Sequence, residues 1–324
     1  MKKQPNNLFS RVNGLILDCI SYIFCGLLLI RSAITKIYFS FINIDNPIIR
    51  LMRLDKPVGY LLVVFPTWWV IGMTAQNPIS ILFFCLFFLV GAILVRGAGC
   101  IINDILDKEI DKKVARTKDR PLASDELTIK QALQILLVLL FFAVILLLML
   151  PKDAVYIGIF AMIPISIYPL MKRVTYFPQV FLGFTFNIGV LIAWLTVAQN
   201  FGWPPVLIYF ASVFWTLGYD TLYAYQDIKD DIKLNIKSTA IKFKEKGPKF
   251  VWYFYQITLA LICIAGLHMH LNFGFFAMMS LAGYQLYWQI ENIDILDEKN
   301  CAAKFKSNIE FACLVFAAVL IGRI

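Results

Sequence analysis

The chain has 324 residues, of which 60% are hydrophobic and only 16% are charged, and its mean hydropathy is +0.73. A soluble domain of this length carries more charge, so the composition excludes an ordinary soluble protein and indicates an integral membrane protein. The net charge of +9 does not require nucleic acid as a partner, because cationic loops also set membrane topology and bind anionic lipids.

The first 46 residues are the most ambiguous part of the chain. Residues 14–30 are apolar, but the run is short and is interrupted by Asp18. A signal-like segment, a tenth membrane span and an amphipathic helix on the membrane surface all fit this pattern. We favour the surface helix, because a spanning segment would place the cationic residues before it on the outer side. We therefore divide the chain into an N-terminal extension, 1–46, and one membrane domain, 47–324.

Nine apolar runs follow, and each is close to the roughly 18 residues that cross a hydrocarbon core of about 30 Å. The runs are continuous rather than alternating, which favours helices over strands. We therefore predict an all-α membrane protein with nine transmembrane helices. The predicted spans are 58–75, 79–102, 129–150, 154–170, 178–198, 205–225, 250–267, 273–290 and 309–324.

The positions of the cationic residues predict the orientation of these spans. Apart from Arg96, Lys152 and Arg323, the Lys and Arg residues lie before the first run or close behind an even-numbered one. Cytoplasmic segments of membrane proteins are enriched in Lys and Arg. The N-terminus and the long loops at 103–128 and 227–249 are therefore expected on the cytoplasmic side.

An acidic cluster follows the second run, in the pattern N-D-x-x-D-x-x-x-D. Its members are Asn103, Asp104, Asp107 and Asp111. At about 100° per residue, the three Asp side chains fall within about 60° of arc on a helix. If the helix continues past Ile102, their oxygens project from one face at the membrane boundary.

A second acidic cluster overlaps the end of the sixth run. Asp220, Asp227 and Asp231 are spaced i, i+7, i+11 and fall within about 40° of arc on a helix. Asp220 lies inside an apolar run, and a carboxylate within the membrane is functional by default. Two helices that are distant in sequence are thus predicted to present carboxylates at the same membrane level.

Carboxylates held this close repel one another, and Asp at a helix C-terminus opposes the helix dipole. We therefore expect cations among them. Oxygen ligands without His or Cys favour Mg²⁺, and the interleaved basic residues suit phosphate oxygens. The basic residues concerned are Lys112, Lys113, Arg116, Lys118, Arg120, Lys172 and Arg173. For either cluster taken alone, a solvated charged loop is the alternative.

Four segments carry a family resemblance: RLDKPVGYLLVVFPTWW, RGAGCIINDILDKEIDKKVARTKDRPLAS, YPLMKRVTYFPQVFLGFTFN and WTLGYDTLYAYQDIKDDIKLNIKSTA. From about Arg50 to the C-terminus, the sequence resembles the UbiA superfamily of intramembrane prenyltransferases. The RGAGC lead-in, the RTKDRPLAS tail and the GYDTLYAxQD block resemble its 4-hydroxybenzoate branch more than the menaquinone, haem or chlorophyll branches. The resemblance implies nine transmembrane helices around a central cavity.

The resemblance also implies an activity. This is the Mg²⁺-dependent transfer of a polyprenyl group from polyprenyl diphosphate to the ring of 4-hydroxybenzoate, in ubiquinone biosynthesis. We expect a cell inner membrane enzyme whose active site faces the cytoplasm. We expect membrane lipid as a partner and no nucleic acid, and no obligate protein partner is evident. The implied metal ligands are Asn103, Asp104, Asp107, Asp111, Asp227 and Asp231.

Other residues receive roles from the same resemblance and from their chemistry. Arg53 and Arg96 are candidates for the acceptor carboxylate, Asp220 for orienting the phenol or accepting its proton, and Tyr168 for bonding the diphosphate. Membrane anchoring by Arg53, a structural ion pair of Arg96 with a motif Asp, and an interfacial position of Tyr168 are the alternatives. The cationic residues expected to hydrogen-bond the departing diphosphate are Arg116, Lys118, Arg120 and Lys172.

Two other functions remain open at this point. A family member with another acceptor, such as a naphthoate, differs only in family-specific segments. A cation-coupled transporter would use Asp220 and Arg96 as a charge relay. A relay needs polar groups across the whole membrane, whereas the outer halves of these runs hold almost no ionisable residues.

Overall fold

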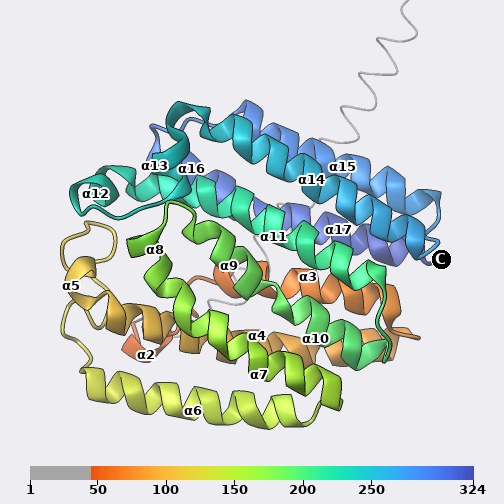
Figure 1. Cartoon of the computed structure of the whole chain (residues 1–324), viewed down its shortest axis with the longest axis horizontal. Coiled ribbons are helices and arrows are strands. Elements are labelled where there is room, and N and C mark those ends of the chain that lie inside the picture. The colour runs from red at the N-terminus through yellow and green to blue at the C-terminus, as the bar shows by residue number, and fades with distance from the viewer. Residues whose placement is uncertain (1–44) are drawn as a thin grey trace, which may run out of the picture. The chain divides into compact units, whose positions relative to one another are not determined.

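The structure is a computed structural model that describes residues 45–324, of which 46–324 form one compact unit. The predicted surface helix of the N-terminal extension lies outside the described residues. The described part contains helices and no strand, which confirms the all-α prediction. Its long helices run alongside one another, and several short helices gather at one end of the bundle, among them α5 (Lys108–Asp111) and α12 (Ile228–Lys233) (Figure 1).

The long helices follow the predicted apolar runs, with one difference in the fifth run. That run is split in two at Asn187, whose side chain donates hydrogen bonds to Gly183 O at 2.8 Å and Thr216 Oγ1 at 2.9 Å. The long helices are α3 Val58–Thr74, α4 Pro78–Leu106, α6 Ile129–Leu148, α7 Lys152–Ile167, α9 Pro178–Phe186, α10 Ile188–Val197, α11 Trp203–Ala224, α14 Gly247–His268, α15 Phe273–Glu291 and α17 Asn308–Gly322. The remaining elements are α2 Pro47–Leu51, α8 Met171–Val174, α13 Thr239–Phe243 and α16 Glu298–Lys306, with 3₁₀ turns η1 Tyr168–Leu170, η2 Tyr225–Asp227 and η3 Lys244–Lys246.

Local capping fixes where several of these helices begin. Asn77 caps α4 by accepting a hydrogen bond from Ser80 N, and a proline occupies the first helical position. Thr128 and Gln131 form a reciprocal capping box at the start of α6. Such side chains satisfy backbone donors that have no partner within the helix, so the loops before α4 and α6 end at defined residues.

Within residues 45–324, six helical segments are long and apolar enough to cross a membrane. The predicted count of nine spans is therefore not confirmed. Helix α3 has only 17 residues, and α11 and α15 are less apolar than the six. The reason is visible in α15, where Gln285 and Gln289 are fully buried and Gln285 donates to Ser307 O at 2.7 Å. A helix that turns polar groups into a bundle does not need an apolar surface all round.

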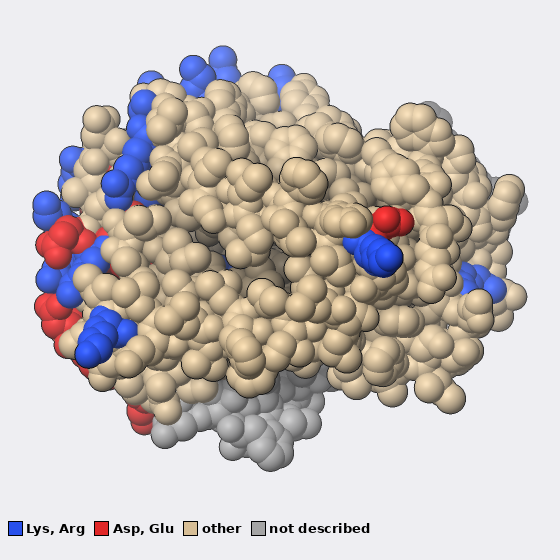
Figure 2. Space-filling model, turned by 60° about the horizontal axis from the view of Figure 1, so that its bottom comes forward, with Lys and Arg blue, Asp and Glu red and all other residues tan. Residues whose placement is uncertain are grey.

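The six segments are Pro78–Leu106, Ile129–Leu148, Lys152–Val174, Pro178–Val197, Thr239–His268 and Glu298–Gly322. Their outward side chains include large apolar groups, such as Leu137 on α6 and Phe160 on α7, which are exposed. The charged side chains gather at one end of the face shown in Figure 2 and leave most of that face uncharged. A multi-pass membrane protein has this distribution, because lipid-facing helix surfaces exclude charge.

Residues of α4 and α11 line a common cavity. Helix α3 packs against α4, α10 and α17, and α11 packs against α9 and α14. The acidic ends of α4 and α11 both lie at the end where the short helices gather (Figure 1). The two acidic clusters predicted from sequence therefore lie on elements that end in the same part of the molecule.

Candidate functional site

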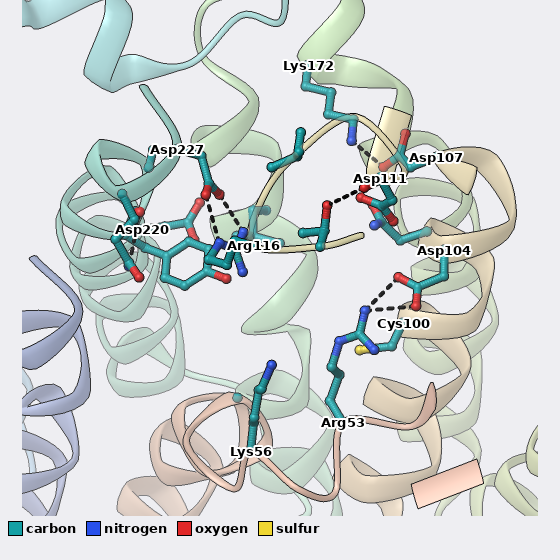
Figure 3. Close-up of a pocket in the computed structure, with 18 of the residues that line it drawn as sticks. Arg53, Lys56, Cys100, Asp104, Asp107, Asp111, Arg116, Lys172, Asp220 and Asp227 are labelled. Atoms are coloured by element: carbon teal, nitrogen blue, oxygen red, sulfur yellow. Dashed lines mark hydrogen bonds and ion pairs between the residues drawn. The ribbon is translucent and has the colours of Figure 1, made fainter. Parts of the chain in front are cut away.

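A cavity of about 810 Å³ lies at the charged end of the bundle. Figure 3 shows residues of the first cluster on one side of it and residues of the second cluster on the other. All but one of the site residues predicted from sequence line this cavity. They are Arg53, Arg96, Asn103, Asp104, Asp107, Asp111, Arg116, Arg120, Tyr168, Lys172, Asp220, Asp227 and Asp231.

The exception is Lys118, which was predicted to hydrogen-bond the diphosphate. Lys118 is exposed and is not among the lining residues. The hydroxyl of Thr117 donates to Asp111 O at 3.0 Å and turns the loop at this point. Arg116, Thr117, Asp119 and Arg120 all line the cavity, and Lys118 is the one residue of this stretch that does not.

The first acidic segment, residues 103–111, comes from a helix that continues beyond the predicted membrane boundary. Helix α4 extends to Leu106, and α5 begins directly after Asp107. Asp107 has φ −103° and ψ 6°, so the axis changes at this residue. The predicted continuation past Ile102 is confirmed. Asp104, Asp107 and Asp111 are buried, with 1%, 2% and 6% of their surface exposed.

Cationic side chains of the protein neutralise this first segment. Arg53 donates to both carboxylate oxygens of Asp104 at 2.8 Å. Arg120 bridges Asp104 at 3.1 Å and Asp111 at 2.7 Å. Lys172 forms an ion pair with Asp107 (Figure 3). Each of these three carboxylates therefore has a fixed cationic partner.

Arg53 reaches Asp104 from an unusual backbone conformation. Its φ is 59°, in the left-handed region that residues other than glycine rarely adopt. The guanidinium also donates to Arg50 O at 2.8 Å, which holds the turn between α2 and α3. Strain of this kind persists where surrounding contacts enforce it, and it concentrates at functional sites.

The fourth helical segment supplies Tyr168 and Lys172. Pro164 lies inside α7, and the chain then passes through η1 into α8, so that Tyr168 begins one short element and Lys172 lies in the next. Lys237 N donates to Lys172 O at 2.9 Å and ties this segment to the loop after α12. The two residues of the Tyr-x-x-x-Lys element are thus both brought to the cavity.

The second acidic segment, residues 220–231, is less regular and less neutralised. It runs from α11 through η2 into α12, so one continuous helix does not align its carboxylates. Arg116 donates through Nε to Asp227 at 2.7 Å and lies over the ring of Tyr223, 5.1 Å from its centroid. Among residues 45–324, no side chain forms an ion pair with Asp220 or Asp231.

The environment of Asp231 favours its neutral form. Burial, together with the charge of Asp227, raises the pKa of Asp231 to about 7. The nearby cations Lys172 and Arg116 oppose this shift only in part. A cation bound beside Asp231 would therefore interact with a carboxyl group that has no ion-pair partner within residues 45–324.

These contacts change the argument for a metal. Repulsion among the carboxylates of the first segment is relieved by Arg53, Arg120 and Lys172, so repulsion alone does not require an added cation. In the described residues, no three acidic, His or Cys side chains are already arranged as a metal site. The donor chemistry nevertheless fits Mg²⁺, because carboxylate and amide oxygens line one cavity, and Asp220 and Asp231 have no ion pair within residues 45–324.

Arg96 lies deeper in the cavity wall. Its Nη1 is 2.8 Å from Cys100 Sγ, and its guanidinium carbon is 5.3 Å from the centroid of the Phe186 ring. Within the described part of the chain it forms no ion pair, and its Nε is buried without a hydrogen-bond partner. The alternative of a structural pair with a motif Asp is therefore not what the structure shows. Arg96 is available to an anion.

Sequence reasoning missed Lys56, which points into the cavity beside Arg53 (Figure 3). Its side chain has no ion pair within residues 45–324. Lys56 lies in RLDKPVG, one of the segments that carry the family resemblance, so its position was a usable signal. Tyr223 and Phe186 were also missed, because aromatic residues are too frequent in this chain for sequence alone to select them.

Comparison with known proteins gives concordant results. The model of the UbiA prenyltransferase family matches residues 63–316. The mitochondrial 4-hydroxybenzoate polyprenyltransferase of Arabidopsis thaliana is 40% identical over 276 residues, which covers 85% of this chain and 68% of the relative.

Two solved structures have a similar fold. A UbiA homologue from Aeropyrum pernix K1 superimposes with a TM-score of 0.68 and 16% identity, covering 83% of this chain and 98% of the other. A UbiA homologue from Archaeoglobus fulgidus, bound to GPP and Mg²⁺, superimposes with a TM-score of 0.62 and 16% identity. The match covers 85% of this chain and 99% of the other. At this identity the likeness concerns the fold.

Proposed function

Because this chain belongs to the UbiA prenyltransferase family, we propose that it transfers a polyprenyl group from polyprenyl diphosphate to the ring of 4-hydroxybenzoate. The products are 3-polyprenyl-4-hydroxybenzoate and diphosphate, and the pathway is ubiquinone biosynthesis. One observation carries the proposal: a single cavity holds both acidic segments, four cationic side chains paired with them and the unpaired Arg96. The name of the Arabidopsis relative supports the choice of acceptor.

The acidic segments form the donor end of the proposed site. We assign Asn103, Asp104, Asp107, Asp111, Asp227 and Asp231 to holding Mg²⁺. Asp104 also positions Arg53 and Arg120. When bound, Mg²⁺ supplies positive charge to the diphosphate oxygens and so stabilises the leaving group. A UbiA homologue from Archaeoglobus fulgidus was solved with GPP and Mg²⁺ bound, which supports the choice of metal and the class of donor.

Lys172, Arg116 and Arg120 are the proposed hydrogen-bond donors to the diphosphate. Each now pairs with a carboxylate that lines the cavity. Diphosphate oxygens can share these donors, because Lys and Arg carry several N–H groups each. Donors held in place before substrate binds stabilise the developing charge without reorganising. Tyr168 lines the same cavity, and its hydroxyl can donate a hydrogen bond to a diphosphate oxygen.

The bond changes follow from these placements. The allylic C–O bond breaks, and its electron pair leaves with the diphosphate. The ring carbon beside the phenol oxygen forms the new C–C bond with the allylic carbon, and the proton on that ring carbon is then lost. We assign Asp220 to accepting a proton or orienting the phenol, because it lines the cavity and has no ion-pair partner in the described chain. The rings of Tyr223 and Phe186 lie against cations already and can face the allylic cation.

Arg96 is the better of the two candidates for the acceptor carboxylate. Arg53 is held by both oxygens of Asp104, whereas Arg96 has no carboxylate partner among residues 45–324. The Nε of Arg96 is buried without a hydrogen-bond partner, which is costly for a charged group, and a bound carboxylate would remove that cost. The acceptor ring would then lie between Arg96 and the donor end.

The cationic end of the bundle is proposed to face the cytoplasm, because Lys and Arg concentrate there (Figure 2). The cell inner membrane expected from sequence stays a prediction, since the Arabidopsis relative is described as mitochondrial.

The test is a membrane assay with labelled 4-hydroxybenzoate, Mg²⁺ and prenyl diphosphates of several lengths, alongside the same assay with phenol and with a hydroxynaphthoate. Wild-type protein is expected to prenylate 4-hydroxybenzoate and to lose this activity when Mg²⁺ is chelated. Arg96→Met is expected to raise KM for 4-hydroxybenzoate by at least about tenfold and to leave KM for the donor unchanged. Prenylation of the hydroxynaphthoate alone, or absence of any prenylated product, would contradict the proposal.

A further inference from the structure

Two lysines lie around one tyrosine ring at the charged end of the bundle. The Nζ atom of Lys237 lies 5.6 Å from the centroid of the Tyr176 ring, and the Nζ atom of Lys242 lies 5.8 Å from the same centroid. Tyr176 is 40% exposed and Lys242 is exposed as well, so a ligand can reach them. We call these three residues the Tyr176 cluster.

The Tyr176 cluster has no acidic partner within residues 45–324. Lys237 Nζ donates one hydrogen bond, to Val174 O at 3.0 Å, and neither lysine forms an ion pair with a carboxylate of that part of the chain. The surrounding segment, 237–249, holds five Lys and a single Glu. Two like charges near one ring repel each other, and an exposed ring offsets only part of that cost. A bound anion would relieve the repulsion.

The Tyr176 cluster lies where two apolar segments begin. Tyr176 comes two residues before the segment Pro178–Val197, and Lys237 comes two residues before the segment Thr239–His268. Lys242 lies in α13, near the start of the second segment. Helices α8 and α13 both lie at the end of the bundle where the short helices gather (Figure 1). The cluster is therefore at a boundary of the membrane-spanning part.

Aromatic side chains continue from the cluster as a row of contacts. Phe177 meets Phe243 edge to face with ring centroids 6.1 Å apart, and Phe243 stacks on Phe250 at 4.3 Å. Phe177 and Phe250 are exposed. We call these three residues the aromatic row. Exposed rings at a membrane boundary lie between headgroups and acyl chains. Apolar surface beside two ammonium groups is the combination that binds an amphipathic anion.

We propose that the Tyr176 cluster and the aromatic row bind an anionic phospholipid, with its phosphate beside the two ammonium groups and its acyl chains along the exposed rings. The cytoplasmic leaflet, which the charged end is proposed to face, carries anionic lipids that attract lysines near the membrane surface. A free phosphate would pair with the lysines without contacting the rings. A zwitterionic lipid would contact the rings but would bring no net negative charge to the lysines.

Binding at this place would act on the main cavity through the backbone. Lys237 N donates to Lys172 O at 2.9 Å, and Thr239 N donates to Gln179 Oε1 at 3.1 Å. Lys172 in turn forms an ion pair with Asp107 in the cavity. A lipid that holds the Lys237 side chain therefore also holds the segment that is bonded to Lys172. We expect anionic lipid to raise kcat/KM for the prenyl donor, and this consequence rests on the proposed function.

The experiment measures lipid binding to the full-length protein by native mass spectrometry, with phosphatidylglycerol and, separately, with phosphatidylcholine. Wild type is expected to bind one phosphatidylglycerol at least about tenfold more tightly than phosphatidylcholine. Lys242→Gln and the double variant Lys237→Gln/Lys242→Gln should lose about fivefold in affinity for phosphatidylglycerol for each lysine removed. Their affinity for phosphatidylcholine should stay unchanged, which also shows that the variants fold.

The double variant Lys244→Gln/Lys246→Gln is the matched control. It removes the same charge from the same segment, at exposed side chains that lie over no aromatic ring of residues 45–324. It should keep its affinity for phosphatidylglycerol within about twofold of wild type. Equal affinities of wild type for the two lipids, or an equal loss in the control, would overturn the site. Displacement of phosphatidylglycerol by an equal concentration of inorganic phosphate would also overturn it, in favour of a soluble anion.

Activity measurements separate this site from the proposed function. When phosphatidylglycerol is added to phosphatidylcholine vesicles, kcat/KM for the donor should rise about fivefold in wild type but not in Lys237→Gln/Lys242→Gln. Selective lipid binding without this rise would refute the link to Lys172 and leave the binding site in place. Selective lipid binding by a protein that forms no prenylated product in any vesicle would refute the proposed function alone.

Discussion

The two acidic segments face the same cavity but differ in how their charge is compensated. In the first, residues 103–111, every Asp is buried and paired with Arg53, Arg120 or Lys172. In the second, residues 220–231, only Asp227 has an ion pair, and Asp220 and Asp231 have none within the described chain. The charge of the first segment is thus already compensated by cationic side chains of the protein. The charge of the second segment is compensated only in part. The difference indicates that an incoming cation would be added mainly from the side of the second segment.

The largest expected effect is the loss of turnover when either segment loses its central carboxylate. Asp107→Ala and Asp227→Ala should each lower the rate of prenylation by about a thousandfold or more, because each removes charge aimed at the leaving group. Initial rates at equal amounts of inserted protein measure this. Asp125→Ala is the matched control, since Asp125 pairs with Lys108 outside the cavity. Normal rates in either cavity variant would remove the metal assignment of that segment.

The next effect is on the free energy of unfolding. It tests whether the ion pairs of the first segment stabilise the fold more than the ion pair of the second segment does. Arg53→Met leaves Asp104 buried with only the longer contact to Arg120, and should lower the free energy of unfolding by about 3 kcal/mol. Arg116→Met, at the more exposed pair with Asp227, should cost about 1 kcal/mol or less. Equilibrium unfolding in mixed micelles compares the two. Adding Asp104→Asn to Arg53→Met should recover part of the loss, and equal costs for the two Arg variants would refute the contrast.

A third prediction concerns pH and the second segment. In the folded protein the pKa of Asp231 is about 7, above the value of roughly 4 expected in an unfolded chain. The folded state therefore binds more protons between these values, and its stability should fall as pH rises from about 4 to 7. Melting temperatures of metal-free protein should show a steeper decline in wild type than in Asp231→Asn. Identical pH profiles would show that Asp231 is not held neutral.

The smallest effect is expected at Lys118. Lys118→Ala should leave the rate within about twofold of wild type, because the side chain is exposed outside the cavity. Arg120→Ala, two residues further on, should lower the rate and destabilise the protein, since Arg120 bridges Asp104 and Asp111. The two variants measured side by side test the turn at Thr117. A large loss of rate in Lys118→Ala would instead support the diphosphate-binding role predicted from sequence.

Much of the fold could be predicted because its signal is local. Continuous apolar runs predict membrane helices one by one, and each run coincides with a helix or, at Asn187, with two. Apolar runs alone could not show whether α11 and α15 cross the membrane. Their lower apolarity reflects polar groups that are satisfied inside the bundle, such as Gln285 bonded to Ser307. Sequence does not show which partner a buried amide will find.

The site was predictable to the extent that helical spacing and family-like segments select residues. Spacing alone brought out Asp104, Asp107 and Asp111 on a helix that does continue. It failed for the second segment, where η2 interrupts the helix, although the cavity still gathers the same carboxylates. The ion pairs were not predictable, because Arg53 and Arg116 reach their partners across long sequence separations. Lys118 does not line the cavity because of the backbone turn at Thr117. The number and spacing of charged residues in the sequence do not reveal such a turn.

The central claim is that both acidic segments hold the same divalent ion together with a diphosphate. The most direct measurement is the binding of Mn²⁺, as a spectroscopic substitute for Mg²⁺, by paramagnetic resonance in the presence and absence of pyrophosphate. Wild-type protein should bind Mn²⁺ more tightly when pyrophosphate is present, and Asp107→Ala and Asp227→Ala should each weaken that binding by at least about tenfold. Undiminished, pyrophosphate-dependent binding in either variant would contradict a shared site.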